Sequence, residues 1–231
     1  MAGNDSEGLR YGVIETPEKY YLNWKEETGI RNKLDNSLSV LCKKERFLEL
    51  IHDFIVFDMG QKKIARHNQY FAVKETQKKL NKREGGIIWH TQGSGKTLTM
   101  IWVAKWIREN KSDSRVLIIT DREELDDQIE QRFYGIDEAI YRTKSGKDLI
   151  KKLDNAEPWL ICSLIHKFGR TQSEQEDDFV EIFSKIPKDF KAKGDIYVFV
   201  DECHRTQSGK MHKAMKSIIP NSVFVGFTGT P

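Results

Sequence analysis

Short apolar runs alternate with amphipathic stretches along the chain after Gly85. Each run has the length of a buried β-strand, and helical segments separate most of the runs. Such an alternation predicts βαβ units, in which parallel strands build one sheet with helices on both of its faces. The expected strands are Ile87–His90, Val116–Thr120, Trp159–Leu164, Ile196–Asp201 and Val223–Thr228.

The pattern before Gly85 is different. Apolar residues recur at helical spacing over Glu45–Phe57, and Ile64–Leu80 is a second helical stretch. Residues 1–36 are polar and irregular, with scattered aromatic side chains that suggest packing against an upstream domain. We therefore expect three parts: a lead-in over 1–44, a mostly helical extension over 45–84 and the α/β domain over 85–231.

Composition excludes several classes of protein. Charged residues make up 32% of the chain, hydrophobic residues 38%, and there are five prolines, which excludes collagen-like, low-complexity and wholly disordered chains. No apolar run approaches the roughly 20 residues that span a bilayer, and the N-terminus has no secretory signal. We therefore expect a cytoplasmic protein with no membrane partner. The three cysteines are far apart, so neither a disulfide framework nor a zinc site is expected.

The distribution of charge is more informative than the net charge of +3. The stretch from Gln61 to Arg83 contains eight basic residues and a single acidic residue, Glu75. Such a stripe can contact nucleic-acid phosphates, but a solvated helix face is the alternative that the pattern alone favours. The basic residues are Lys62, Lys63, Arg66, Lys74, Lys78, Lys79, Lys82 and Arg83.

The segment HTQGSGKT, from His90 to Thr97, follows an expected strand and opens an expected helix, which is the context of a phosphate-binding P-loop. Glycines let backbone N–H groups converge on phosphate oxygens, and the helix N-terminus adds a positive dipole. The Lys96 side chain can reach the β- and γ-phosphates, while the Thr97 hydroxyl can ligate Mg²⁺. The segment departs from GxxxxGK(S/T) because His90 replaces the first glycine. The residues expected to bind nucleotide are Gly93, Ser94, Gly95, Lys96 and Thr97.

An acidic pair, Asp201 and Glu202 in the segment DECH, follows the apolar run IYVFV. Carboxylates at the C-terminal ends of parallel strands lie where such sheets bind ligands. Asp201 would hold Mg²⁺, and Glu202 would orient and deprotonate an attacking water. A polar strand end without chemistry is the alternative, but the P-loop-like segment upstream favours the catalytic interpretation.

Together with the final segment FTGTP, these motifs resemble the first RecA-like motor domain of superfamily 2 helicases and translocases. More narrowly, they are similar to the motor (R) subunit of type I restriction enzymes, and the resemblance covers nearly the whole chain. It implies a P-loop NTPase fold with a RecA-like parallel sheet, preceded by a lead-in from a nuclease domain. The segments that carry it are Phe54–Val73, Gly85–Met100, Ile118–Ile129, Val200–Gln207 and Gly226–Pro231.

The resemblance also implies roles for single residues near the nucleotide. Gln69 matches the glutamine that reads the adenine edge in such motors, with a surface helical glutamine as the alternative. His204, Thr228 and Thr230 would couple the nucleotide state to the grip on DNA. His90 is expected to be a packed polar residue.

For DNA contacts, the resemblance points to two loops. Thr120 and Arg122 match a segment whose backbone and basic groups hold DNA phosphates, with a first-turn helix residue as the less favoured alternative for Arg122. Ser163 and Lys167 occupy a second candidate loop, for which a role without DNA is an equal alternative.

The resemblance implies ATP and Mg²⁺ as ligands, and double-stranded DNA and the modification and specificity subunits as partners. The intact subunit would couple ATP hydrolysis to DNA translocation and cleavage. The alternatives are the same domain of another superfamily 2 helicase or remodeller, or a nucleotide- or DNA-binding module without turnover. The chain contains no QxxGRxxR-like segment, and an arginine finger contributes about 10³–10⁵ in rate. We therefore expect a fragment with little or no ATPase activity and no nuclease activity.

Overall fold

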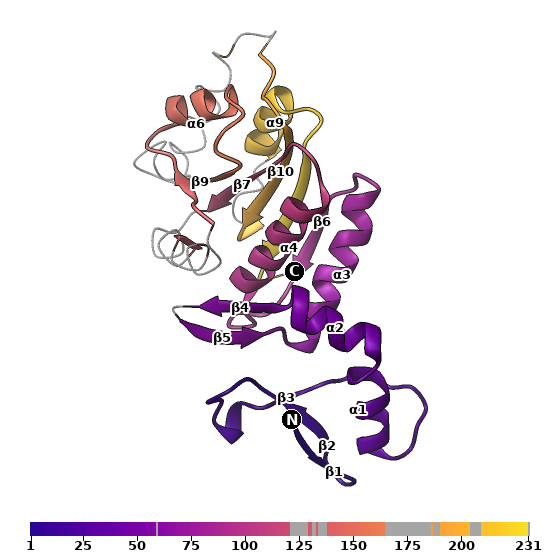
Figure 1. Ribbon diagram of the computed structural model, residues 1–231. Helices are drawn as coiled ribbons and strands as arrows, with labels where there is room; N and C mark the ends of the chain where they lie inside the picture. Colours follow the sequence, from indigo (N-terminus) through magenta and orange to yellow (C-terminus); the bar gives the residue numbers. More distant parts are fainter. Residues whose placement is uncertain are drawn as a thin grey trace. The chain divides into compact units, whose positions relative to one another are not determined.

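The computed structural model describes residues 1–58, 60–120, 129–130, 133, 138–164, 186, 190–203 and 209–230. The chain forms two compact units, Met1–Lys74 and Glu75–Pro231 (Figure 1).

A six-stranded sheet is the centre of the second unit. Its strands run in the order β6-β11-β10-β7-β9-β8, and every neighbouring pair is parallel. The five strands expected from the apolar runs are all present, which confirms the α/β class. The sheet contains β6 (Gly86–Trp89), β7 (Ser114–Thr120), β8 (Tyr141–Arg142), β9 (Leu160–Leu164), β10 (Asp195–Asp201) and β11 (Val223–Thr228).

Helices cover both faces of this sheet (Figure 1). All seven residues of β7 are buried, because successive side chains point to opposite faces and each face meets a helix. Leu117 and Ile119 join a core with α6 (Gly146–Leu153) and α9 (Gly209–Ile218). The other face is covered by α4 (Lys96–Asn110), most of whose residues are buried.

One buried arginine joins the elements beside the start of β7. All five N–H groups of the Arg115 guanidinium donate to backbone carbonyl oxygens at 2.8–3.3 Å. The acceptors are Lys152 and Leu153 at the end of α6, together with Pro158 and Lys193 in two loops. Arg115 therefore adds charged donors to carbonyls at the end of α6 and joins them to the two loops.

The first unit contains two small antiparallel sheets as well as helices. The N-terminal sheet has the order β1-β2-β3, and a separate hairpin pairs β4 with β5. α3 begins in this unit and continues into the second. The elements are β1 (Ala2–Asn4), β2 (Gly8–Tyr11), a 3-10 helix (Glu18–Tyr20), β3 (Leu22–Asn23), α1 (Lys33–Leu41), α2 (Lys44–Asp53), β4 (Ile55–Asp58), β5 (Gln61–Ile64) and α3 (His67–Asn81).

The hairpin corrects the expectation of a mostly helical extension. The helix expected over Glu45–Phe57 ends at Asp53, and Ile55–Asp58 forms a strand instead. A β-branched and aromatic run followed by Gly60, whose φ is 77°, favours a strand and a turn. Residues 1–36, expected to be irregular, contain the small β1-β2-β3 sheet and the start of α1.

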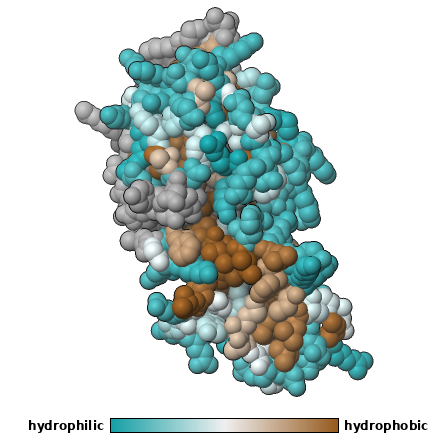
Figure 2. Space-filling model, in the orientation of Figure 1, coloured by the Kyte–Doolittle hydropathy of each residue, from teal (hydrophilic) through white to brown (hydrophobic). Residues whose placement is uncertain are grey.

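Hydrophobic side chains gather on the surface of the first unit (Figure 2). They include Leu38 on α1 and Phe47, Leu48 and Ile51 on α2. Within the described part of the chain, no helix is both long and apolar enough to cross a bilayer.

Candidate nucleotide-binding site

Three neighbouring strands bring the three sequence motifs to one edge of the sheet. β6 leads into the P-loop, β11 ends in Thr228, and β10 ends in Asp201. The register pairs Trp89 with Thr228 and Phe227 with Asp201. Because parallel strands lie about 4.8 Å apart, the loops that follow them are immediate neighbours. The structure thus assembles one site from segments that are far apart in the sequence.

The P-loop has the backbone shape that anion binding requires. Gly93 and Gly95 have φ angles of 76° and 83°, in the left-handed region that favours glycine. A Cβ atom at Gly93 would meet nothing within 4 Å, so the space beside this residue is open. α4 begins directly afterwards at Lys96, and its N-terminal dipole favours a negative ligand there.

Lys96 lies between the P-loop and the TGT segment. Its Nζ donates to the carbonyl oxygen of His90 over 3.4 Å, a long contact that a phosphate oxygen can replace. A Cβ atom at Gly229 would lie 3.3 Å from the same Nζ, so the TGT segment closes directly against the lysine. The His90 N–H donates to the Thr228 carbonyl at 3.0 Å and fixes this approach.

The TGT segment is a turn stabilised by its own hydroxyl group. The Thr228 hydroxyl donates to the carbonyl oxygen of Thr230 at 2.8 Å and accepts from the Thr230 N–H at 3.2 Å. Thr228 is buried, whereas Thr230 is exposed. The turn therefore begins at a buried residue, Thr228, and ends at a solvent-exposed residue, Thr230.

Asp201 and Glu202 are both buried at the end of β10. Glu202 has a φ of 45°, a left-handed conformation that is costly for a residue with a side chain. The next residue, Cys203, packs so tightly that a Cβ atom at Gly226 would lie 2.8 Å from its Sγ. The glycine in β11 thus makes room for the segment that carries the acidic pair.

Burial, reinforced by the charges of Asp201 and Glu202, raises the pKa of the Cys203 thiol. This cysteine is therefore a packed neutral side chain and not a reactive thiolate.

The oxygen groups at this edge fit a magnesium ion. Thr97, buried in the first turn of α4, offers a hydroxyl, and Asp201 offers a carboxylate. Mg²⁺ binds proteins through one or two carboxylates and takes its remaining ligands from water and phosphate. Among the described residues there is no cluster of three or more His, Cys, Asp or Glu side chains arranged for a metal.

His90 occupies the position where many P-loops have glycine. Burial, together with the charge of Lys96, lowers the pKa of the imidazole below its ordinary value. Its Nδ1 is buried without a hydrogen-bond partner. His90 is therefore a neutral, packed side chain, as the sequence predicts.

Gln69 is buried in the first unit, with 2% of its surface exposed, so it is not a surface helical glutamine. Its Oε1 accepts from the Arg66 N–H at 2.8 Å and caps the start of α3. This capping role was missed, although the signal is a glutamine at the third position of a helix. Adenine reading by Gln69 stays a prediction.

Two of the candidate DNA-contact residues, Thr120 and Ser163, lie in the described part of the chain, and both are buried. Thr120 is 0% exposed and Ser163 is 1% exposed, and the Thr143 hydroxyl donates to the Ser163 hydroxyl at 2.9 Å. Arg122, Lys167 and the coupling candidate His204 lie outside the described residues. Contact between these residues and DNA stays a prediction.

The basic stripe is partly neutralised by acidic neighbours, which favours the solvated-face interpretation. Four of its cations form ion pairs, and the Arg83–Asp195 pair is bidentate at 2.8 Å for both bonds. The pairs are Lys74–Glu49, Lys78–Glu75, Lys79–Glu84 and Arg83–Asp195.

Comparison with known families agrees with this geometry. Residues 68–231 match the family model described as the SWI2/SNF2 ATPase. The chain belongs to the SWI2/SNF2 ATPase family. The match covers the whole parallel sheet and all three motifs at its edge.

Curated relatives of this SWI2/SNF2 chain are endonuclease subunits of type I restriction enzymes. Putative subunits MjaIXP and MjaVIIIP of Methanocaldococcus jannaschii are 30% and 32% identical, over 95% and 90% of this chain. The HindI subunit of Haemophilus influenzae is 29% identical over 87% of this chain. The chain spans 21–22% of the length of these relatives.

Solved structures show the same fold at low sequence identity. The Sulfolobus solfataricus SWI2/SNF2 ATPase core in complex with dsDNA has a TM-score of 0.55 and 17% identity, covering 79% of this chain and 34% of that one. The UvsW helicase of bacteriophage T4 has a TM-score of 0.54 and 18% identity, covering 81% and 60%. The RecA-like fold of the sheet is thereby confirmed.

Proposed function

We propose that this chain is the ATP-binding half of an ATP-dependent double-stranded DNA translocase in a type I restriction–modification enzyme. The observation that carries the proposal is the meeting of the P-loop, the acidic pair and the TGT turn at adjacent strand ends. Nucleotide binding follows from membership of an ATPase family. The restriction context is supported by relatives that are endonuclease subunits.

In this proposal each residue of the site has a separate role in phosphoryl transfer. The backbone around Gly93 and Gly95 and the N-terminus of α4 cradle the phosphates, and Lys96 neutralises charge on the β- and γ-phosphoryl groups. Glu202 accepts a proton from the attacking water. Thr97 and Asp201 would hold Mg²⁺, which when bound offsets the negative charge of the phosphoryl oxygens.

The contact between the P-loop and the TGT turn supports a coupling role. Phosphate binding draws Lys96 away from the His90 carbonyl, and Gly229 lies directly against the same ammonium group. A change in the bound phosphates would therefore move the Lys96 ammonium group, and this movement would act on the neighbouring TGT turn at Gly229. We propose that Thr228 and Thr230 pass this change on to the grip on DNA.

In the intact subunit, ATP turnover would drive translocation of double-stranded DNA toward a nuclease, with recognition and methylation supplied by the specificity and modification subunits. The arginines that stabilise the transition state in such motors come from a second RecA-like domain. The chain alone is therefore proposed to bind Mg-ATP but to hydrolyse it slowly.

The test is an ATPase assay on this chain and on the full-length subunit side by side, with and without double-stranded DNA. We expect rapid, DNA-stimulated turnover only in the full-length protein. Glu202→Gln in that protein should retain ATP binding and lose most turnover, with Glu138→Gln as a matched control. Equal rates for the chain and the full-length protein would contradict the half-motor proposal.

A further inference from the structure

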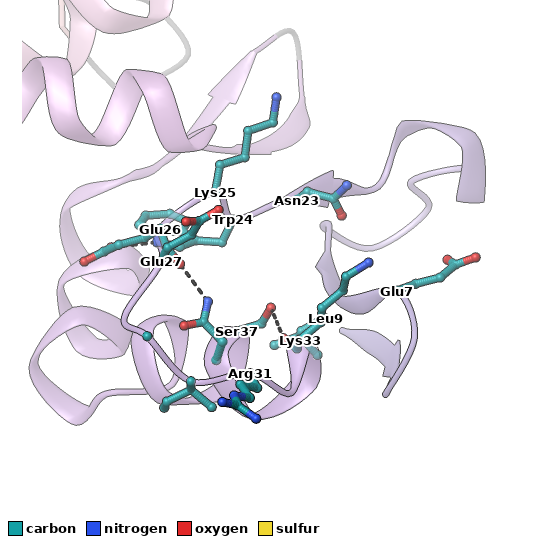
Figure 3. Close-up of a pocket in the computed structure, with 13 residues that line it drawn as sticks. Glu7, Leu9, Asn23, Trp24, Lys25, Glu26, Glu27, Arg31, Lys33 and Ser37 are labelled. Atoms are coloured by element: carbon teal, nitrogen blue, oxygen red, sulfur yellow. Dashed lines mark hydrogen bonds between the residues drawn. The ribbon is translucent and has the colours of Figure 1, made fainter.

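A hollow of about 560 Å³ lies in the first unit, and Figure 3 shows the side chains that line it. The Ser37 hydroxyl donates to the Lys33 carbonyl oxygen at 2.8 Å, and the Asn36 amide donates to the Glu26 carbonyl oxygen at 2.7 Å. These polar groups thus bond to the backbone of the unit itself, and the charged residues of the lining are both acidic and basic. The hollow therefore favours no particular class of ligand.

The second unit has an exposed tryptophan directly before the P-loop. Trp89 is the last residue of β6, the strand at one end of the strand order, and 58% of its surface is exposed. The other four tryptophans of the chain are buried or half-buried. An indole ring favours burial, whereas its N–H requires a polar partner. The partner of the Trp89 N–H belongs to the TGT turn.

Trp89 holds one end of the peptide unit in the middle of this turn. Its indole N–H donates to the Gly229 carbonyl oxygen over 3.4 Å. The N–H of the same peptide unit belongs to Thr230, and it donates to the Thr228 hydroxyl at 3.2 Å. Because a peptide unit is planar, bonds at its two ends fix the orientation of the whole unit. At 3.4 Å the indole bond is long, so small shifts of the turn change its strength.

The peptide that Trp89 holds lies directly against Lys96. A Cβ atom at Gly229 would be 3.3 Å from the Lys96 Nζ, 3.7 Å from the Gln92 backbone nitrogen and 3.8 Å from the His90 carbonyl oxygen. The Lys96 ammonium group also donates to that carbonyl oxygen, so it lies between the start of the P-loop and the backbone of the turn. A backbone wall that restricts a flexible lysine lowers the entropy that this side chain loses on binding phosphate.

We infer that Trp89 is a positioning residue for Lys96, acting through the Gly229–Thr230 peptide unit of the TGT turn. The inference rests on the proposed function, in which Lys96 binds the β- and γ-phosphates of ATP. Trp89 itself touches no nucleotide in this account. Its indole N–H sets the orientation of the peptide unit, and the peptide unit limits the space that is open to the ammonium group. Phenylalanine keeps an aromatic ring and lacks the N–H, so Trp89→Phe isolates the hydrogen bond.

The experiment measures the affinity of the 231-residue chain for Mg-ATP by titration calorimetry in a double-mutant cycle. The variants are Trp89→Phe, Lys96→Ala and the combination of both, with Trp106→Phe as the matched control. Trp106 is a half-buried tryptophan in the C-terminal part of α4, whereas the P-loop precedes the N-terminus of this helix. Circular dichroism melting of each variant checks that the fold is retained.

We expect Trp89→Phe to lower the ATP affinity about threefold, within the range that one lost neutral hydrogen bond allows. Trp106→Phe should leave the affinity unchanged. In the Lys96→Ala background, Trp89→Phe should have no further effect, because the ammonium group that it positions is gone. Should Lys96→Ala bind too weakly to titrate, Lys96→Arg, which keeps the charge and changes the shape of the head group, takes its place in the cycle.

The outcomes separate this inference from the proposed function. An unchanged ATP affinity in Trp89→Phe, beside a clear loss in Lys96→Ala, would overturn the positioning role and leave the proposed function standing. Equal losses from Trp89→Phe with and without the lysine would show an effect that does not pass through Lys96, and they would also overturn the positioning role. No measurable ATP binding by the unmodified chain would contradict the proposed function itself, and the inference would fall with it.

Discussion

At the scale of single residues, the site depends on backbone conformations and close approaches that few side chains allow. Gly93 and Gly95 adopt positive φ angles, and Glu202 adopts one despite its side chain. Gly226 leaves just enough room for Cys203, the residue that follows Glu202. Strain and tight packing therefore meet at the acidic pair, where the proposed chemistry needs a fixed carboxylate.

The contact between Gly226 and Cys203 predicts a coupled pair of substitutions. Gly226→Ala should destabilise the chain by about 1–3 kcal/mol, because its methyl group would lie 2.8 Å from the Cys203 sulfur. Cys203→Ala removes that sulfur, so the double variant should be less destabilised than the sum of the single variants. Urea unfolding of the three variants measures the coupling. Additive effects would show that the two residues do not compete for the same space.

At the scale of elements, hydrogen bonds from two arginine side chains connect the ends of strands and helices. All five N–H groups of the Arg115 side chain donate hydrogen bonds to backbone carbonyl oxygens at the end of α6 and in two neighbouring loops. Arg83 joins the segment after α3 to the start of β10 through Asp195, and it also donates to the Asn221 carbonyl before β11 at 2.7 Å. The sheet edge opposite the candidate site is thus held by two arginines.

Arg115 should contribute strongly to stability. Arg115→Met is expected to cost about 2–4 kcal/mol in the free energy of unfolding, because five hydrogen bonds from a buried charged donor to four carbonyl groups are lost. Lys147→Met, on the exposed side of α6, removes the same charge and should change stability by less than about 0.5 kcal/mol. Denaturant unfolding curves give both values. A loss for Arg115→Met no larger than that of the control would contradict the bracing role.

The Arg83–Asp195 pair should make stability depend on pH in the acid range. Burial alone would raise the pKa of Asp195, but hydrogen bonds from Arg83 and Tyr197 and the charge of Arg83 outweigh it and lower the pKa. The stabilisation is therefore fully present above the unfolded pKa of about 3.9, and it is lost as pH falls through the lower folded pKa.

Unfolding midpoints measured between about pH 6 and pH 3 for the unmodified chain and Asp195→Asn check this dependence. The unmodified chain should be the more stable at the upper end, and its advantage should shrink below about pH 4. An advantage that stays constant across the range would show that the carboxylate charge contributes nothing.

At the scale of the whole molecule, the chain combines a RecA-like parallel sheet with a smaller unit of two small antiparallel sheets and helices. Four of the eight cations of the basic stripe are paired with acids, so any DNA affinity of the chain should be weak and independent of sequence. If the stripe does contact phosphates, affinity should fall steeply with salt. Fluorescence anisotropy with a labelled duplex at low and physiological ionic strength tests this, and a flat response would support the solvated face.

The sequence predicted the sheet well because its strands are continuous apolar runs bounded by polar segments. It did not predict β8, since the two residues Tyr141 and Arg142 are too few to form a pattern. The hairpin after Asp53 was assigned to a helix, because Phe54 and Ile55 fit a helical period as well as a strand. The P-loop and acidic pair were found from local motifs, whereas the contacts of Arg115 join segments that are far apart in the sequence and depend on the folded chain.

The central claim is that the loop before α4 binds the phosphates of ATP. Titration calorimetry with Mg-ATP on the unmodified chain and on Lys96→Ala tests it most directly, with Lys105→Ala in the same helix as the control. We predict saturable binding for the unmodified chain and the control, and at least about a tenfold loss of affinity in Lys96→Ala, because a charged hydrogen bond to phosphate is removed. Equal affinity in Lys96→Ala would contradict the account.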